Sequence, residues 1–349
     1  MASGSATHSS ALVTGATGLV GSYLIERLLD DGWSVRALSR DPARARPAIP
    51  GGNAVEIARG DVLDQASFAQ AAMGMHVIFH AAANIIVRGG WESFRVTNVE
   101  GTQNAIEAAE RSRARLLQVS SVAVYGGRAR YEAARRGSRT NEATPLAPLP
   151  ERAYYARSKR ESEEMVLRAH TQGRIWATAV RPVVVYGRRD RQFVPRMARL
   201  IRRFPMPLLN GGRSIFGVVH AANVADGAVR AATSDVAGGR AYNLANDFDV
   251  DVRSFFELAG EGLGRRPFFI PMPLWAARGA LRGLKAAARL LSGGTFSLVS
   301  NSAIDFIAED NPFSSDRARR ELGWAPRMRH EIGVPDAFRW WAEKQKGAA

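Results

Sequence analysis

Residues 11–21 read Ala11-Leu12-Val13-Thr14-Gly15-Ala16-Thr17-Gly18-Leu19-Val20-Gly21. The apolar residues before the first glycine predict a buried strand, and apolar residues at helical spacing over 19–30 predict a helix. This order leaves backbone N–H groups at a helix N-terminus, where the helix dipole attracts a pyrophosphate. The spacing is G-x-x-G-x-x-G rather than G-x-G-x-x-G, so the motif alone leaves an ordinary tight turn open. We expect the residues that hold a dinucleotide here to be Gly15, Thr17, Gly18, Leu19, Val20 and Gly21.

The composition is that of a globular protein with a large core. The chain has 349 residues, of which 46% are hydrophobic, which suits one large domain or one domain with a smaller lobe. It has no cysteine, which excludes disulfides and thiolate metal sites. Residues 1–9 are small and polar, and we interpret them as a disordered tail rather than a signal peptide. No apolar run of about 18 residues is present. We therefore expect no integral membrane span and a cytoplasmic location.

The net charge of +15 comes almost entirely from arginine. Only four of the 48 basic residues are lysines, so 44 are arginines, and they are scattered along the chain. They lack the interleaved aromatic residues of a nucleic-acid stacking surface. We therefore expect a small-molecule substrate and no nucleic acid partner. The overall positive field favours anionic small molecules such as NADP.

Strand and helix patterns alternate through the first half of the chain. This alternation predicts an α/β fold, a doubly wound parallel (Rossmann) sheet, with a smaller C-terminal α/β substrate lobe. Residues 10–190 are assigned to the dinucleotide-binding domain. Residues 191–345 are assigned mainly to the lobe, with some segments returning to the first domain. The ligand site is expected outside the carboxyl ends of the strands. The main predicted strands are 34–39, 55–58, 77–80, 116–120 and 176–180, and the main predicted helices are 94–109 and 153–170.

The strand over 34–39 ends in Ser39-Arg40-Asp41, where such a site selects its cofactor. An acid about 20 residues past the glycines binds the ribose 2′-hydroxyl of NAD, whereas an arginine can hold a 2′-phosphate. Ser39 and Arg40 therefore favour NADP over NAD. Asp41 as the acid, after a shift of one residue, remains an alternative.

Two further strand ends carry residues suited to the cofactor. Asp61 follows the third strand, with Val62 beside it, and its carboxylate can accept a hydrogen bond from an adenine amino group; a turn aspartate is the alternative. Small residues after the fourth strand let a cofactor lie close to the backbone; these are Ala81, Ala82 and Ala83. His80 precedes them, but no second histidine at metal spacing accompanies it, so no metal site is predicted.

Tyr155 and Lys159 are four residues apart on a predicted helix, so their side chains share a face. A tyrosine has an unperturbed pKa of about 10, and a nearby ammonium group lowers that pKa by favouring the phenolate. The hydroxyl of Ser121, at the end of the fifth strand, can hold a substrate oxygen. These three residues can move a proton to or from that oxygen while hydride moves to or from a nicotinamide. Tyr154 has Ser158 at the same spacing, and is not expected to take this role.

Together these motifs resemble those of extended short-chain dehydrogenases/reductases, the NAD(P)-dependent epimerase/dehydratase family. The resemblance is to the branch of dihydroflavonol-4-reductases and 3β-hydroxysteroid dehydrogenases. It runs from about residue 10 to residue 341 and rests on the stretches 14–21, 60–62, 80–83, 98–102, 119–121, 155–159, 181–182 and 320–324. It implies that Ser121, Tyr155 and Lys159 are catalytic and that Lys159 also binds the nicotinamide ribose. It further implies a proton-relay role for Asn98, a nicotinamide wall that includes Pro182 and Val184, and a homodimer.

Within this family the sequence favours a reductase or dehydrogenase. The dehydratases carry a Thr-Asp-Glu set where this chain has Ser121-Val122-Ala123, which argues against dehydration. Val122, Val124 and an apolar pattern with spaced basic residues over 271–291 suit a bulky, largely apolar substrate. We interpret 271–291 as a lobe helix; contact with a membrane surface is the alternative. A nucleotide-sugar epimerase with recycled NAD(P), and a non-catalytic dinucleotide-binding protein, remain as competing functions.

Overall fold

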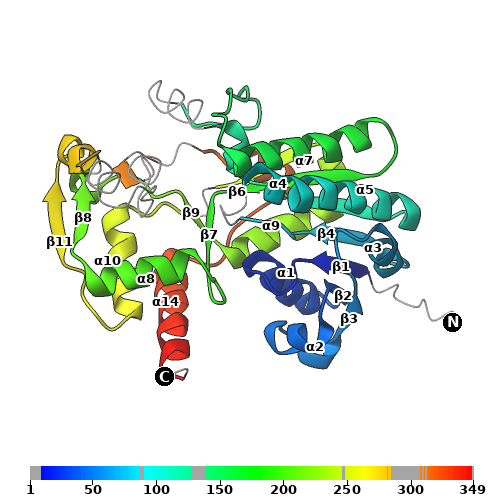
Figure 1. Cartoon of the computed structure of the whole chain (residues 1–349), viewed down its shortest axis with the longest axis horizontal. Helices are drawn as coiled ribbons and strands as arrows, with labels where there is room; N and C mark the ends of the chain where they lie inside the picture. Colours follow the sequence, from blue (N-terminus) through cyan, green and yellow to red (C-terminus); the bar gives the residue numbers. More distant parts are fainter. Residues whose placement is uncertain are drawn as a thin grey trace.

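The structure is a computed structural model that describes residues 9–85, 90–126, 138–245, 248–280, 282–283, 307–308, 310 and 313–347. Its centre is a parallel sheet with the strand order β10-β6-β5-β4-β1-β2-β3 (Figure 1). The order reverses between β1 and β4, which is where a doubly wound sheet binds ligands. The strands are β1 (Ser10–Thr14), β2 (Ser34–Ser39), β3 (Val55–Arg59), β4 (Val77–His80), β5 (Arg115–Val119), β6 (Ala177–Pro182) and β10 (Ala241–Leu244).

Helices cover both faces of this sheet, which confirms the predicted fold class. On one face α1 (Leu19–Asp30) packs beside α9 (Ala221–Thr233). On the other face lie α3 (Gln65–Ala72), α5 (Gly101–Ser112) and α7 (Tyr154–Thr171). The buried side of α1 consists of the residues whose spacing predicted the helix, among them Leu24, Ile25 and Leu28. The cofactor loop is therefore fixed between a buried strand and a buried helix.

A smaller lobe stands beside the sheet, at the left of Figure 1. It contains α8 (Phe193–Arg203), α10 (Val252–Gly262) and α14 (His330–Lys346), and an aromatic core around Phe216, Phe255 and Phe338. Two short parallel strand pairs complete it; they are β7 (Val184–Tyr186) with β9 (Val218–His220), and β8 (Met206–Leu209) with β11 (Phe269–Met272). β10 is a strand of the large sheet, and α9 packs against that sheet. Segments after residue 191 therefore do return to the first domain. The boundary at residue 190 remains a prediction.

Shorter elements complete the described chain. They are α2 (Pro42–Ala45), α4 (Gly90–Phe94), α13 (Asp316–Leu322), a π-helical segment η3 (Arg95–Glu100), and 3₁₀ turns at Arg46–Ala48, Gly52–Ala54, Val122–Tyr125, Asn210–Gly212 and Asp235–Ala237. In the part of the chain that the structure describes, no helix combines the length and apolar character that a membrane crossing needs.

The structure corrects two predicted helices. The helix expected over 94–109 is instead α4, η3 and α5 in succession, so Asn98 lies in a π-helical turn. In the pattern over 271–291, Pro271 and Met272 belong to β11, because β8 provides a parallel partner strand. Residues 274–280 are helical, whereas 281 and 284–291 lie outside the described residues. Residues 1–8 of the expected tail lie outside them as well.

Candidate active site

The glycine loop between β1 and α1 is shaped by close backbone contacts. Gly15 has a φ of +65°, and a Cβ there would stand 2.8 Å from the backbone nitrogen of Ala82. A Cβ on Gly21 would collide with the carbonyl oxygen of Gly15. α1 begins at Leu19, and its N-cap residue Gly18 provides no side-chain cap to the first turn. The loop therefore offers backbone N–H groups with no side chain in front of them, which fits the pyrophosphate of a dinucleotide.

At the end of β2, Arg40 is exposed and the Asp41 carboxylate is hydrogen-bonded. The Asp41 carboxylate accepts a hydrogen bond from the backbone N–H of Arg44 at 3.1 Å and caps α2. The Ser39 hydroxyl accepts one from the N–H of Asp41 at 3.2 Å. Arg40 is exposed and makes no hydrogen bond or ion pair with the described residues. The Asp41 carboxylate therefore stabilises a local helix start, whereas the Arg40 guanidinium stays exposed.

Asp61 and Val62 are half-buried just beyond β3. The Asp61 carboxylate accepts a hydrogen bond from the backbone N–H of Leu63 at 3.1 Å, so it also stabilises a local turn. Neither residue lines the cavity that contains the proposed catalytic group. Their contact with an adenine remains a prediction.

A cavity of about 570 Å³ lies at the carboxyl ends of the central strands. It brings together the glycine loop, the turn after β4, the end of β5, α7 and the segment after β6. The predicted site residues that line it are Gly15, Gly18, Leu19, Val20, Gly21, Ala81, Ala83, Ser121, Tyr155, Lys159, Pro182 and Val184. Residues more than 160 positions apart in the chain thus share one site, as expected at this edge of the sheet.

Ser121 and Tyr155 form the polar centre of this cavity. Both side chains line the cavity, and Ser121 is close enough to influence the ionisation of the Tyr155 phenol. Burial raises the pKa of the Tyr155 phenol above its ordinary value of 10.0, and the neighbouring Ser121 hydroxyl opposes that rise. The phenol is consequently protonated at neutral pH in this structure, and can donate a proton to a substrate oxygen.

Lys159 lies on the same face of α7 but faces a different partner from the one expected. Its ammonium donates a hydrogen bond to the carbonyl oxygen of Val119 at 2.8 Å. Burial lowers its pKa to about 8, and Glu163 opposes the shift. The expectation that Lys159 lowers the pKa of Tyr155 is not met here, because the ammonium is directed to the end of β5 and is not among the groups that shift the phenol.

A buried ion pair fixes α7 against the sheet. The Nε of Arg181, in β6, lies 3.0 Å from Oε2 of Glu163, and its Nη1 donates to the Tyr125 hydroxyl at 2.7 Å. Both partners of the ion pair are almost fully buried. Glu163 stands one helical turn after Lys159, so this pair sets the position of the helix that holds Tyr155 and Lys159. Sequence reasoning noted Arg181 but missed Glu163. The one feature that could have indicated Glu163 is its position four residues after Lys159 on the same helix.

Asn98 lies behind the site rather than in its cavity. Its side chain accepts from the N–H of Asn84 at 2.6 Å and donates to the Ser158 hydroxyl at 2.9 Å. Ser158 in turn donates to the carbonyl oxygen of Tyr155 at 2.9 Å. In this structure Asn98 therefore joins the turn after β4 to α7. A role in a proton relay remains a prediction.

His80 and Thr14 link the two central strands below the cofactor loop. The His80 Nδ1 and the Thr14 hydroxyl lie 2.9 Å apart, and Thr14 also accepts from the N–H of Ala82 at 3.1 Å. Burial, together with Lys159, lowers the pKa of His80 to about 3, so the ring is neutral. This neutral histidine holds the small-residue turn in place. Among the described residues no group of His, Cys, Asp or Glu is arranged to bind a metal ion.

Sequence reasoning predicted little of the outer wall of the cavity beyond Val122 and the stretch from Pro182 to Val184. The wall consists largely of apolar side chains from four separate segments, with a charged loop at one side. The residues concerned are Ile85, Val122, Val183, Val185, Phe193 and Phe313, with Arg189, Asp190, Arg191 and Gln192 from the loop. Apolar residues next to Ser121 could be predicted from their position in the sequence. The remaining wall residues come from distant segments that meet only in the folded chain.

The profile of the NAD dependent epimerase/dehydratase family matches residues 11–245. The chain belongs to this family. It is an extended short-chain dehydrogenase/reductase enzyme, and its glycine loop fits the nicotinamide dinucleotide that the family uses.

Its relatives are mostly dehydrogenases and reductases. It is 31% identical over 330 residues, 94% of this chain and 95% of the relative, to 4-hydroxy-2-methyl-3-oxo-4-farnesyl-3,4-dihydroquinoline-1-oxide ketoreductase of Stigmatella aurantiaca. It is 27% identical over 333 residues, 90% of this chain and 85% of the relative, to 3 beta-hydroxysteroid dehydrogenase/Delta 5→4-isomerase of Mycobacterium tuberculosis. Among solved structures it resembles MoeE5 in complex with UDP-glucose and NAD. The TM-score of this comparison is 0.69, and the match covers 97% of this chain and 100% of the other. At 22% sequence identity it shows a likeness in fold alone.

Proposed function

We propose that this chain is an NADP-dependent oxidoreductase that transfers hydride between the nicotinamide and a carbonyl or secondary alcohol of a bulky, largely apolar substrate. The observation that carries the proposal is that Ser121 and Tyr155 meet inside a cavity with an apolar outer wall. The 31% identical relative is a ketoreductase whose named substrate carries a farnesyl chain, which supports the same substrate class.

The residues of the site have distinct parts in the reaction. The Ser121 hydroxyl holds the carbonyl oxygen, and the Tyr155 phenol donates a proton to it. The bound cofactor supplies the hydride. In the reverse direction, Tyr155 accepts the proton of the alcohol. Lys159 is the only described lysine in the cavity, and its depressed pKa lets it take up or release a proton near neutral pH.

The preference for NADP rests on Arg40 and Asp41. Arg40 has no partner among the described residues and is exposed at the end of β2, whereas Asp41 caps α2. A guanidinium binds a phosphate through paired, charge-assisted hydrogen bonds. The 2′-phosphate of NADP is the group that this arginine would meet.

The direct test is oxidation of NADPH and of NADH, followed by absorbance, against steroid, flavonoid and long-chain ketones. We expect net oxidation with at least one ketone and a clear preference for NADPH. Tight cofactor binding without oxidation on any ketone would contradict the proposal and favour a nucleotide-sugar epimerase, for which nucleotide sugars are the next substrates to test. A preference for NADH would contradict the role of Arg40 alone.

We further propose a cytoplasmic homodimer that pairs through the helical face of α5 and α7. These helices lie side by side on one face of the sheet (Figure 1). Light scattering coupled to size-exclusion chromatography measures the mass in solution. A mass twice that of the 37.9 kDa chain is expected, and a monomer at assay concentrations would contradict the pairing.

A further inference from the structure

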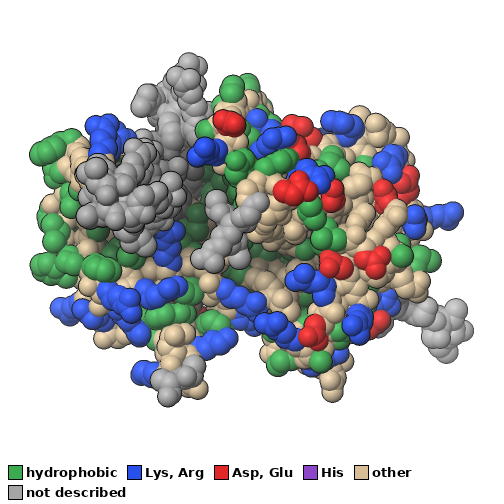
Figure 2. All heavy atoms as spheres, in the orientation of Figure 1, with side chains coloured by type: hydrophobic (Ala, Val, Ile, Leu, Met, Phe, Trp, Pro, Cys, Tyr) green, Lys and Arg blue, Asp and Glu red, His purple; other side chains and the backbone are tan. Residues whose placement is uncertain are grey.

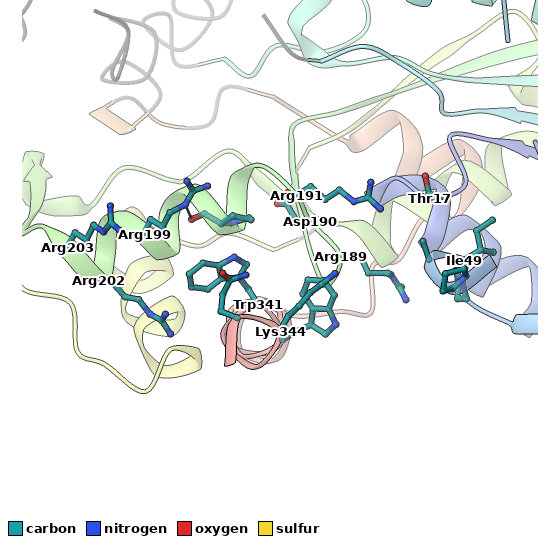
Figure 3. A pocket seen from close by; sticks show the side chains of 16 residues that line it. Thr17, Ile49, Arg189, Asp190, Arg191, Arg199, Arg202, Arg203, Trp341 and Lys344 are labelled. Carbon is teal, nitrogen blue, oxygen red and sulfur yellow. Dashed lines mark hydrogen bonds between the residues drawn. The ribbon is translucent and has the colours of Figure 1, made fainter. Parts of the chain in front are cut away.

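A second hollow has a volume of about 810 Å³, and Figure 3 shows the side chains that line it. One end is formed by Thr17 of the glycine loop and the turn over 47–50. The other end lies between α8 and α14. Residues 189–191 line both the hollow and the catalytic cavity. We call this hollow the basic groove.

Six cationic side chains line the basic groove; they are Arg189, Arg191, Arg199, Arg202, Arg203 and Lys344. Arg189 is the one with an acidic partner among the described residues, Glu26, at 2.7 Å. The single carboxylate in the lining, Asp190, is buried and accepts hydrogen bonds from the backbone N–H groups of Gln192 at 2.7 Å and Val194 at 3.0 Å. The groove therefore has six cationic side chains against one carboxylate in its wall, a large excess of positive charge.

The cations are arranged along a concave surface. Arg191 extends toward Thr17 at one end, while Arg199, Arg202 and Arg203 follow α8 away from it (Figure 3). Arg199 and Arg203 are four residues apart on α8, so these cations lie about 6 Å apart along the helix axis, on one stretch of its surface. Lys and Arg side chains also gather over α8 and α14 on the molecular surface (Figure 2).

Two tryptophans hold cations in place at the α14 side. The guanidinium of Arg202 lies 4.9 Å from the ring centre of Trp341, and the ammonium of Lys344 lies 5.1 Å from that of Trp340. Such contacts restrict long side chains before any ligand binds, which lowers the entropy lost on binding. Fixed guanidinium groups match phosphate oxygens in pairs.

We propose that the basic groove binds an organic polyphosphate, in addition to the pyrophosphate of the cofactor at the glycine loop. Two sources share this chemistry. One is a phosphate-bearing handle of the substrate, as in a coenzyme A thioester whose ketone reaches Tyr155. The other is a separate nucleotide that binds beside the site. The first source rests on the proposed reductase function, whereas the binding itself does not.

Binding is tested by calorimetry with coenzyme A and with ATP on the full chain saturated with NADP⁺. We expect both probes to bind, and to bind more weakly as the NaCl concentration rises. The double variant Arg202→Glu, Arg203→Glu should weaken binding by at least about 20-fold. The matched control is Arg266→Glu, Arg320→Glu, which alters the charge equally at exposed residues outside the groove and should change binding about twofold or less.

Failure of both probes to bind wild-type protein would overturn the proposal, whatever the reductase assay gives. Equal losses of probe binding in the groove variant and in the control variant would show that the probes do not bind in the basic groove. If the charge reversal prevents folding, as judged by thermal unfolding, Arg202→Gln with Arg203→Gln replaces it, and undiminished binding there would also refute the site.

The two sources are separated by kinetics. A β-keto thioester of coenzyme A is compared with the same acyl group on N-acetylcysteamine, which lacks the phosphates. A KM at least about tenfold lower for the coenzyme A thioester, lost in the groove variant, identifies a substrate handle. Equal KM values, with coenzyme A or ATP still binding, identify a separate ligand. Both results support the groove as a polyphosphate site.

Discussion

Lys159 should make the stability of this protein depend on pH in an unusual direction. Its side chain is 4% exposed, and burial lowers its pKa to about 8 from the ordinary 10.5. Between these two pH values the unfolded chain binds a proton that the folded chain does not. The free energy of unfolding therefore rises as the pH is raised from 8 to 10.5. The difference between the two pKa values corresponds to about 3 kcal/mol.

The variant Lys159→Met keeps an unbranched side chain, shorter by one heavy atom, and removes the titrating group. At pH 7 it no longer buries a charge, but it loses the hydrogen bond to Val119, worth about 1 kcal/mol. We expect it to be about 2 kcal/mol more stable than wild type at pH 7, and to lack the rise above pH 8. Urea unfolding followed by tryptophan fluorescence at pH 7 to 10 measures the stability at pH 7 and its change above pH 8. The control is Lys344→Met, at an exposed lysine. A variant that keeps the rise, or is less stable at pH 7, would refute the reasoning.

Three further outcomes follow from the site. Glu163→Gln leaves the buried Arg181 without its counter-charge and should lower the free energy of unfolding by about 3–5 kcal/mol; a loss under 1 kcal/mol in urea unfolding would speak against a structural ion pair. Gly21→Ala places a Cβ against a loop carbonyl and should weaken NADPH binding by at least about tenfold, whereas Gly279→Ala, with nothing within 4 Å, should leave the dissociation constant unchanged. Arg40→Ala should raise the KM for NADPH about tenfold and leave that for NADH alone; equal changes for both would contradict a phosphate contact.

The parts of the fold that local pattern controls could be predicted from the sequence. α1 begins and ends where the 3.6-residue spacing and the glycine loop require, and β2 and β4 match their predicted runs over 34–39 and 77–80. Ser121, Tyr155 and Lys159 meet in one cavity because strand ends and the following helix of a parallel sheet lie on the same edge.

What the sequence could not predict depends on partners far along the chain. The spacing of Tyr155 and Lys159 shows that they share a helix face, but not that the Val119 carbonyl takes the ammonium. The π-helical turn at Asn98 goes with its hydrogen bonds to Asn84 and Ser158, which no local pattern records. β11 is a strand because β8 lies beside it, although the same residues read as the start of a helix.

The central claim is that Tyr155 transfers the proton. It is tested most directly by comparing Tyr155→Phe with Tyr154→Phe, its neighbour outside the cavity lining, for NADPH-dependent ketone reduction and for NADPH binding. Tyr155→Phe should lower kcat/KM by at least about 100-fold while the NADPH dissociation constant stays within about twofold, and Tyr154→Phe should keep its activity. Full activity in Tyr155→Phe, or an equal loss in both variants, would contradict the mechanism.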